Sequence, residues 1–228
     1  TFHQRAAKVE RLDMFMHNIN SLAPLRGFTG LRELVVALQH IPTPAGVDAC
    51  TNLERLSLTE VRLTTTEGIG ACARLKFLDV SRNLLTELGA GVVDLPELET
   101  LWANENRLSA LEGLAGNGRL RTLWVARNRI MDVGDQVDGM DALEELNLAA
   151  NGVRSLSDVA GLGALPSLKR LLCADLHYGA CPVCSLSNYE TYALAHLPRL
   201  EQLDGAPVAE EARAAAEGTL VKKRLYYS

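Results

Sequence analysis

The sequence predicts an α/β solenoid, in which short parallel strands line a curved concave face and short helical or 3₁₀ segments line the convex face. The first observation is a leucine pattern that recurs about every 22 residues, with units starting at 9, 31, 53, 75, 98, 120, 143, 168 and 200. The second is a change within each unit from alternating apolar residues to a helical apolar spacing. The chain has 228 residues, of which 47% are hydrophobic and 22% charged, so it can bury a core.

The first half of each unit predicts one strand. If the start is position 0, apolar residues occupy positions 3 and 5, as Leu78 and Val80 do in the fourth unit. Side chains alternate along a strand, so these positions face the core and positions 2, 4 and 6 face the opposite side. Apolar residues at positions 10, 13, 16 and 19, as in the segment 19–28, predict a helical or 3₁₀ return. Cys50 and Cys72 stand at position 19, where we expect buried, small apolar side chains.

An asparagine column is predicted to hold the turn after each strand. A buried amide at position 8 can hydrogen-bond backbone groups of its own and the next unit that would otherwise lack partners. Other residues occupy this position in the outer units. The asparagines are Asn83, Asn106, Asn128 and Asn151, and the replacements are His17, Gln39, Val61 and Leu176.

With these columns the unit reads L-x-x-L-x-L-x-x-N-x-L. It resembles the 22-residue class of leucine-rich repeat found in protein-phosphatase regulators and many cytoskeletal proteins. The resemblance covers nearly the whole chain, and the array itself spans residues 1–199. It is specific for the fold but weak for function, because the same scaffold serves many partners. Only about eight residues precede Val9, so we expect an upstream segment or a partner to cover the first core layer.

Residues 200–228 are predicted to form a C-terminal cap, because the repeat pattern begins once more at Leu200 and then fails. A solenoid needs a polar cap, or its last core layer would face water. The Ala- and Glu-rich stretch that ends at about Tyr227 predicts a helix. Glu210 and Glu211 lie near its start and the basic triplet 222–224 near its end, which is the order that a helix dipole favours.

The segment before the cap carries a more specific resemblance. The sequences DLHYGACPVC at 175–184, YALAHLPRL at 192–200 and VKKRLYY at 221–227 resemble the end of a repeat block in leucine-rich repeat-containing protein 9 and related axonemal proteins. Those are long, multi-block proteins associated with cilia and flagella. The resemblance implies a place in the cytoplasm, in the cytoskeleton of a ciliary or flagellar axoneme, with an axonemal or cytoskeletal protein as partner.

Composition and charge argue against several classes of partner. The net charge is −5 and the basic residues are dispersed apart from the triplet 222–224, so we expect no nucleic acid. No stretch approaches the roughly 18–20 apolar residues of a membrane span, and the start lacks the layout of a signal peptide. Five cysteines at 50, 72, 173, 181 and 184 are not the framework of a secreted, disulfide-bonded scaffold. These features indicate the cytoplasm.

Catalytic chemistry is not expected, and neither is a small-molecule substrate or a cofactor. Catalysis needs a nucleophile or a carboxylate pair in a water-excluding pocket with an orienting partner. The five histidines are dispersed at 3, 17, 40, 177 and 196. The glycine-rich segment 113–118 falls in a predicted convex loop and not between a strand and a phosphate-binding helix.

The spacing C-x₃-H-x₃-C-x₂-C, formed by Cys173, His177, Cys181 and Cys184, is a candidate metal motif. Three thiolates and an imidazole can surround zinc tetrahedrally, and the last two cysteines can alternatively form a redox pair. However, Cys173 occupies an inward strand position, and structural zinc sites use two well-separated ligand pairs. We therefore expect a structural loop without metal.

An aromatic centre is predicted on the concave face. Trp102 and Trp124 occupy position 4 of adjacent strands, about 4.8 Å apart, and Phe77 stands beside them at position 2. One interpretation is that the rings stack and stabilise the sheet by up to about 1 kcal/mol per pair. We favour a protein-binding surface, because tryptophans flanked by charge are typical of binding hot spots. Asp79 at position 4 and Asn104 at position 6 belong to the predicted surface.

Charges of alternating sign border this surface at position 7, which reads Glu60, Arg82, Glu105 and Arg127. An intramolecular row of ion pairs, worth roughly 0–1 kcal/mol per pair at a surface, accounts for them. Equally, Arg82 and Arg127 flank the tryptophans and can select a partner with matching carboxylates. Both interpretations stay open, and we include Arg82, Glu105 and Arg127 in the predicted binding set.

These observations predict a non-enzymatic protein–protein interaction scaffold in a ciliary or cytoskeletal assembly. A regulatory subunit of a protein phosphatase is the alternative that the repeat class permits. A zinc-dependent or redox-active module built on the cysteine-rich loop is a third hypothesis.

Overall fold

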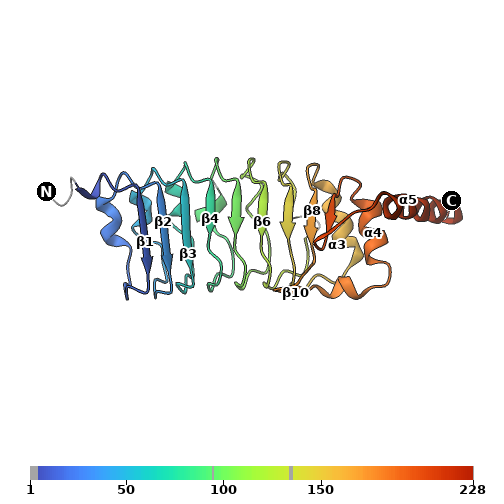
Figure 1. The fold of residues 1–228 in the computed structure, drawn as a ribbon, viewed down its shortest axis with the longest axis horizontal. Helices are drawn as coiled ribbons and strands as arrows, with labels where there is room; N and C mark the ends of the chain where they lie inside the picture. Colours follow the sequence, from blue (N-terminus) through green and yellow to red (C-terminus); the bar gives the residue numbers. More distant parts are fainter. Residues whose placement is uncertain (1–4, 94, 134–135, 228) are drawn as a thin grey trace.

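One sheet runs along the whole solenoid, with one strand from each repeat (Figure 1). The computed structural model describes residues 5–93, 95–133 and 136–227. Within them the strand order is β1 to β8, then β11 and β12, so consecutive repeats are neighbours in space. The strands are β1 Arg11–Phe15, β2 Glu33–Ala37, β3 Arg55–Thr59, β4 Phe77–Asp79, β5 Thr100–Trp102, β6 Thr122–Trp124, β7 Glu145–Asn147, β8 Arg170–Leu172, β11 Gln202–Leu203 and β12 Ala206–Pro207.

Each strand pairs in parallel with the next at equal repeat positions. Leu101, for example, lies opposite Leu123, both at position 3. The side chains of positions 3 and 5 therefore stack into one continuous core, which confirms the predicted fold class. In the first strand Leu12 and Met14 are only half-buried, whereas their counterparts in the following strands are fully buried.

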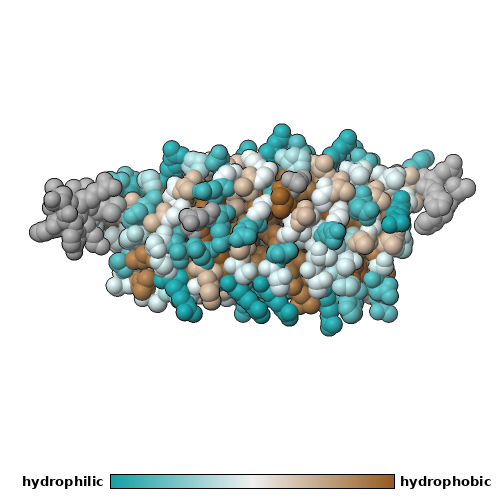
Figure 2. Space-filling view, turned by 180° about the vertical axis from the view of Figure 1, so that it is seen from behind, coloured by the Kyte–Doolittle hydropathy of each residue, from teal (hydrophilic) through white to brown (hydrophobic). Residues whose placement is uncertain are grey.

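The convex returns are short, as predicted, and several consist of a single 3₁₀ turn. Cys50 and Cys72 are fully buried in this layer, where each thiol donates to a main-chain carbonyl oxygen. Figure 2 shows the side opposite to that of Figure 1, with hydrophobic patches between hydrophilic borders. The returns contain η1 Ala23–Gly27, η2 Val47–Ala49, η3 Ile69–Ala71, α2 Ala90–Val93, α3 Leu156–Gly161 and η4 Leu162–Ala164.

The predicted asparagine column is present, and each member uses both ends of its amide. Asn106 Nδ2 donates to the carbonyl oxygens of Ala103 in its own repeat and Val80 in the preceding one, at 3.1 and 3.0 Å. Its Oδ1 accepts from the N–H of Leu85 at 3.1 Å. The same contacts recur at Asn83, Asn128 and Asn151. Every asparagine thus ties its repeat to the one before, and the expectation that it would bond to the next repeat is wrong.

A left-handed turn precedes each of these asparagines. Position 7 has a positive φ, between 53° and 57°, in seven consecutive repeats from Met16 to Ala150, although none of these residues is glycine. Side chains disfavour this region, at a cost of about 1–2 kcal/mol per residue. We attribute its recurrence to the turn that directs position 8 back towards the core. The sequence pattern did not predict this strain.

The column is incomplete where position 8 is not asparagine. Gln39 Oε1 accepts from the N–H of Ile19 at 3.0 Å, but its buried Nε2 has no hydrogen-bond partner among the described residues. Leu176 is fully exposed, so the eighth repeat lacks an inward side chain at this position. Asp204 substitutes for it, because its Oδ1 accepts from the N–H of Cys173 at 2.7 Å.

The C-terminal segment closes the last core layer. β11 pairs in parallel with β8, and β12 returns antiparallel to β11. After η5 Pro182–Ser185, α4 Tyr189–His196 packs between α3 and α5 Glu210–Tyr227, which confirms the predicted cap helix. Arg213 of α5 donates to the carbonyl oxygen of Leu200 at 2.6 Å and fastens the helix to the array. No described helix is both long and apolar enough to cross a membrane.

Replacing Asn106 by Ala should lower the free energy of unfolding by about 2–4 kcal/mol, because the carbonyl oxygens of Val80 and Ala103 and the N–H of Leu85 lose buried partners. The matched control is Gln39→Ala, which removes one such bond and should cost about 1 kcal/mol. Urea unfolding followed by circular dichroism measures both. Equal losses would show that the asparagine contacts between repeats do not hold the array together.

Candidate functional site

An aromatic row, Phe77, Trp102 and Trp124, lies on the concave face of β4, β5 and β6. Trp102 and Trp124 are directly opposite each other in the sheet, and their rings stack with centroids 5.3 Å apart and planes at 22°. Phe77 meets the edge of Trp102, with centroids 5.1 Å apart and planes at 76°. The three side chains are half-buried, so the predicted stacking is present and part of each ring remains accessible.

Charged residues fix both ends of the aromatic row. At one end the Arg55 guanidinium lies 4.2 Å from the centroid of the Phe77 ring, a cation–π contact. At the other end Trp124 Nε1 donates to Glu145 Oε1 at 2.7 Å. Arg170 donates to the other oxygen of Glu145 from Nε and Nη2, at 2.9 and 2.7 Å. A continuous chain of contacts therefore crosses six strands, from β3 to β8, and holds the rings in place.

Two other predicted residues of the concave face are less accessible than expected. Asp79 is half-buried beside Trp102, and its Oδ1 accepts from the N–H of Ser81 at 2.9 Å. Burial raises the pKa of the Asp79 carboxyl, while the hydrogen bonds from Ser81 lower it. Asn104 is 3% exposed and its Oδ1 accepts from the N–H of Ala126 at 2.8 Å. The prediction that Asn104 presents its side chain to a partner is therefore wrong.

The predicted ladder at position 7 forms intramolecular ion pairs. Arg82 lies between Glu60 and Glu105, at 2.8 and 3.0 Å, and Arg127 reaches Glu105 at 3.5 Å. These carboxylates, Glu60 first, raise the pKa of the Arg82 guanidinium. The side chains of Arg82, Arg127 and Glu60 are substantially exposed and that of Glu105 is 26% exposed, so water screens the row and its pairs contribute little to stability.

A folded-back hairpin, residues 174–180, covers the strand-end rim of the later repeats. Its two short strands, β9 Ala174–Asp175 and β10 Gly179–Ala180, are antiparallel, and β10 lies at the lower ends of the sheet strands, below β7 (Figure 1). The N–H groups of His177 and Tyr178 donate to Asp175 Oδ1 and shape its turn. A Cβ placed on Gly179 would lie 3.7 Å from that of Ala150, so the hairpin packs on the seventh repeat.

Tyr178 extends this cover towards the middle of the sheet. Burial raises the pKa of the Tyr178 hydroxyl, and the nearby Glu105 carboxylate adds to the increase. Glu105 belongs to the fifth repeat, three repeats before the one that carries the hairpin. Ala126 and Ala149 at position 6 are fully buried, whereas Ala37 at the same position of the second repeat is half-buried. The strand-end rim is therefore more closed at the sixth and seventh repeats than at the second.

Three thiols of the predicted cysteine motif gather beneath the cap. Cys173 and Cys181 are buried and Cys184 is half-buried, whereas His177 is exposed in the turn of the hairpin. A hydrogen bond between Cys173 and Cys184 lowers the pKa of Cys184 and raises that of Cys173. In the described part of the chain, no group of three or more His, Cys, Asp or Glu side chains is arranged to hold a metal ion.

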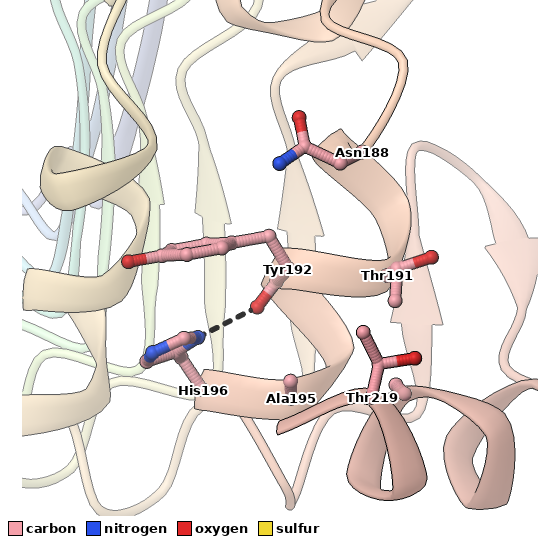
Figure 3. A pocket seen from close by; sticks show the side chains of 7 residues that line it. Asn188, Thr191, Tyr192, Ala195, His196 and Thr219 are labelled. Carbon is pink, nitrogen blue, oxygen red and sulfur yellow. Dashed lines mark hydrogen bonds between the residues drawn. The ribbon is translucent and has the colours of Figure 1, made fainter. Parts of the chain in front are cut away.

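A small cavity of about 60 Å³ lies between the cap helices α4 and α5 (Figure 3). The rings of Tyr192 and His196 lie over each other, with centroids 4.1 Å apart, and His196 Nδ1 is 2.9 Å from the carbonyl oxygen of Tyr192. Its described lining holds this imidazole but no carboxylate or thiol.

The structure adds four residues to the candidate site that the sequence analysis missed. Arg55, Glu145 and Arg170 share position 2 with Phe77, and reading that column as carefully as position 4 would have found them. Tyr178 could not have been found in this way, because only the path of the hairpin brings it near the fifth repeat.

The rung-by-rung register, the asparagine column and the capped end define a leucine-rich-repeat solenoid, a class that generally serves as a protein-interaction module and is typically non-catalytic. The leucine-rich repeat family model matches residues 83–225, which is more than half of the chain. The chain belongs to this family.

Solved structures of bacterial proteins share the fold. Internalin C2 of Listeria monocytogenes is similar with a TM-score of 0.74 and 18% identity, over 88% of this chain and 82% of that one. A second Listeria internalin has a TM-score of 0.62 and 20% identity, over 90% and 64% of the two chains. A leucine-rich-repeat protein of Leptospira interrogans has a TM-score of 0.65 and 18% identity, over 89% and 56%. At these identities the likeness concerns the fold alone.

The thiols should differ in reactivity in the folded protein. Burial raises the pKa of Cys50 to about 11 and that of Cys72 to about 12, so both stay protonated at about pH 8. Cys184, with its lowered pKa and partial exposure, should be alkylated first by iodoacetamide. Mass spectrometry of the peptides measures the order, and the same reaction in denaturant is the control. Equal rates for Cys72 and Cys184 in the native protein would contradict this arrangement.

Proposed function

We propose that this protein is a non-enzymatic scaffold that holds a helical or extended segment of a partner protein across the aromatic row. The observation that carries the proposal is three aromatic rings, half-exposed on a rigid sheet and held by charged residues at both ends. Rings that are already ordered lose little conformational entropy on binding. A buried tryptophan at an interface contributes about 2 kcal/mol or more.

The shape of the concave face favours one direction of approach. The folded-back hairpin narrows the strand-end rim at the seventh repeat, so a bound segment reaches the aromatic row more freely from the N-terminal side. Val35 and Ser57 stand at position 4 there, and both are half-buried and small. A partner chain can thus lie flat over these strands and end against Tyr178.

We further propose that the partner belongs to a ciliary, flagellar or cytoskeletal assembly. The support is the resemblance of the segments 175–184, 192–200 and 221–227 to the end of a repeat block in axonemal proteins. Much of this sequence forms the hairpin and α4, and these elements help to close the array. The resemblance of these segments therefore supports the assignment of the repeat block more strongly than it supports a particular partner.

The test is an affinity pull-down from flagellated cells with the wild-type protein and with the Trp102→Ala plus Trp124→Ala variant. The variant should retain the axonemal proteins at least about tenfold less well, because two binding anchors are lost. The control is Met131→Ala plus Leu186→Ala, which removes two exposed apolar side chains outside the sheet. Circular dichroism must show that both variants are folded.

Equal recovery of the same proteins by the wild type and the tryptophan variant would overturn the binding role of the aromatic row. A phosphatase catalytic subunit as the main recovered protein would replace the axonemal assignment with a regulatory one.

A further inference from the structure

A column of exposed arginines lies on the rim at the C-terminal ends of the strands. We call Arg62, Arg107 and Arg129 the arginine rim; they occupy position 9 of the third, fifth and sixth repeats. The fourth repeat has the half-buried Leu84 at this position. In Figure 2 hydrophilic side chains line the lower border of the molecule, where the strands end.

The arginine rim keeps the register of the sheet although it lies beyond the strands. The N–H of Arg107 donates to the carbonyl oxygen of Leu85 at 2.8 Å, and the N–H of Arg129 donates to that of Leu108 at 2.8 Å. Position 9 of one repeat is thus joined to position 10 of the repeat before it. Arg107 and Arg129 stand on adjacent rungs, about 4.8 Å apart at the backbone.

Two other charged columns of the molecule are neutralised within the chain. At position 1, Glu54 lies between Arg32 and Lys76, at 2.8 and 3.7 Å. At position 7, Arg82 lies between two carboxylates, as described above. By contrast, no carboxylate in residues 5–93, 95–133 and 136–227 forms an ion pair with the arginine rim.

Like charges on adjacent rungs repel each other, and an isolated sheet gains nothing from them. Here they occur in a chain whose net charge is −5 and whose other columns alternate in sign. Carboxylates from outside the chain would neutralise the arginine rim. Each guanidinium can take a carboxylate through two parallel hydrogen bonds.

We propose that the arginine rim binds an extended, acidic segment of a partner protein. The four rungs from Arg62 to Arg129 span about 14 Å, the length of about four to five extended residues. Acidic residues at alternate positions of such a segment lie about 7 Å apart on one side, within reach of the long arginine side chains. An apolar residue between them contacts Leu84.

Apolar side chains along the arginine rim favour a protein segment over nucleic acid. A shallow hollow along the same rim includes Arg62 together with Met16 and Leu38, which are 67% and 40% exposed. Apolar side chains of a peptide can pack against these residues, whereas phosphates would lose hydration there without gaining a partner.

Fluorescence anisotropy with a labelled oligoglutamate peptide at low salt tests this proposal. Binding should weaken by about tenfold or more in the Arg107→Glu plus Arg129→Glu variant and on raising the salt from about 50 to about 200 mM. The matched control is Arg26→Glu plus Arg74→Glu, which makes the same change in net charge at exposed arginines outside the rim. Its affinity should stay within about twofold of the wild type.

Equal losses in the rim variant and the control would reduce the effect to net charge and overturn the proposal. Absence of saturable binding by the wild type, or tighter binding of an oligothymidylate than of the oligoglutamate, would overturn it as well. The Trp102→Ala plus Trp124→Ala protein should bind the oligoglutamate like the wild type. The proposal for the arginine rim can therefore fail while the proposal for the aromatic row stands, and the aromatic-row proposal can fail while the rim proposal stands.

Discussion

The rest of the structure depends on one contact, the asparagine amide that joins three backbone groups of two successive repeats. A repeat of this size cannot bury its own apolar face, so it is stable only when it is stacked in register on its neighbours. The amide reinforces that register in the repeats that carry it, because its Nδ2 reaches the strand ends of both repeats and its Oδ1 accepts from a backbone N–H of the preceding repeat. It also offsets the left-handed turn that precedes it, which side chains otherwise disfavour.

Because the register is set, every position of the repeat becomes a column on the surface. Columns of alternating charge neutralise themselves, as the ion-pair row at position 7 does. The aromatic row is a column of a different kind, held in place by stacking and by its charged ends. The arginine rim is a third kind, whose charge is not neutralised by an ion pair in the described chain. A regular scaffold therefore presents distinct surfaces with no change in its backbone.

The folded-back hairpin is the main departure from this regularity. It arises where the interval between repeat starts lengthens and position 8 is no longer asparagine. Without an asparagine at position 8, the chain leaves the repeat path and runs back along the seventh repeat. It thereby places Tyr178 near the ion-pair row of the earlier repeats. The thiols that looked like a metal motif in the sequence instead become part of the packing beneath the cap, with His177 exposed outside it.

The sequence by itself determined the repeat boundaries, the inward positions, the asparagine column and the adjacency of Trp102 and Trp124, because each follows from a periodicity that the backbone obeys locally. It also identified the ion-pair row, since neighbours in the sheet are neighbours in the repeat. Only the tertiary structure decided that Asn104 is buried, that Glu145 holds Trp124, and that the hairpin lies on the strand-end rim of the seventh repeat. Those outcomes have two causes. The repeat pattern does not determine the path of the hairpin, and a pattern along the sequence does not specify which side chains of neighbouring strands meet.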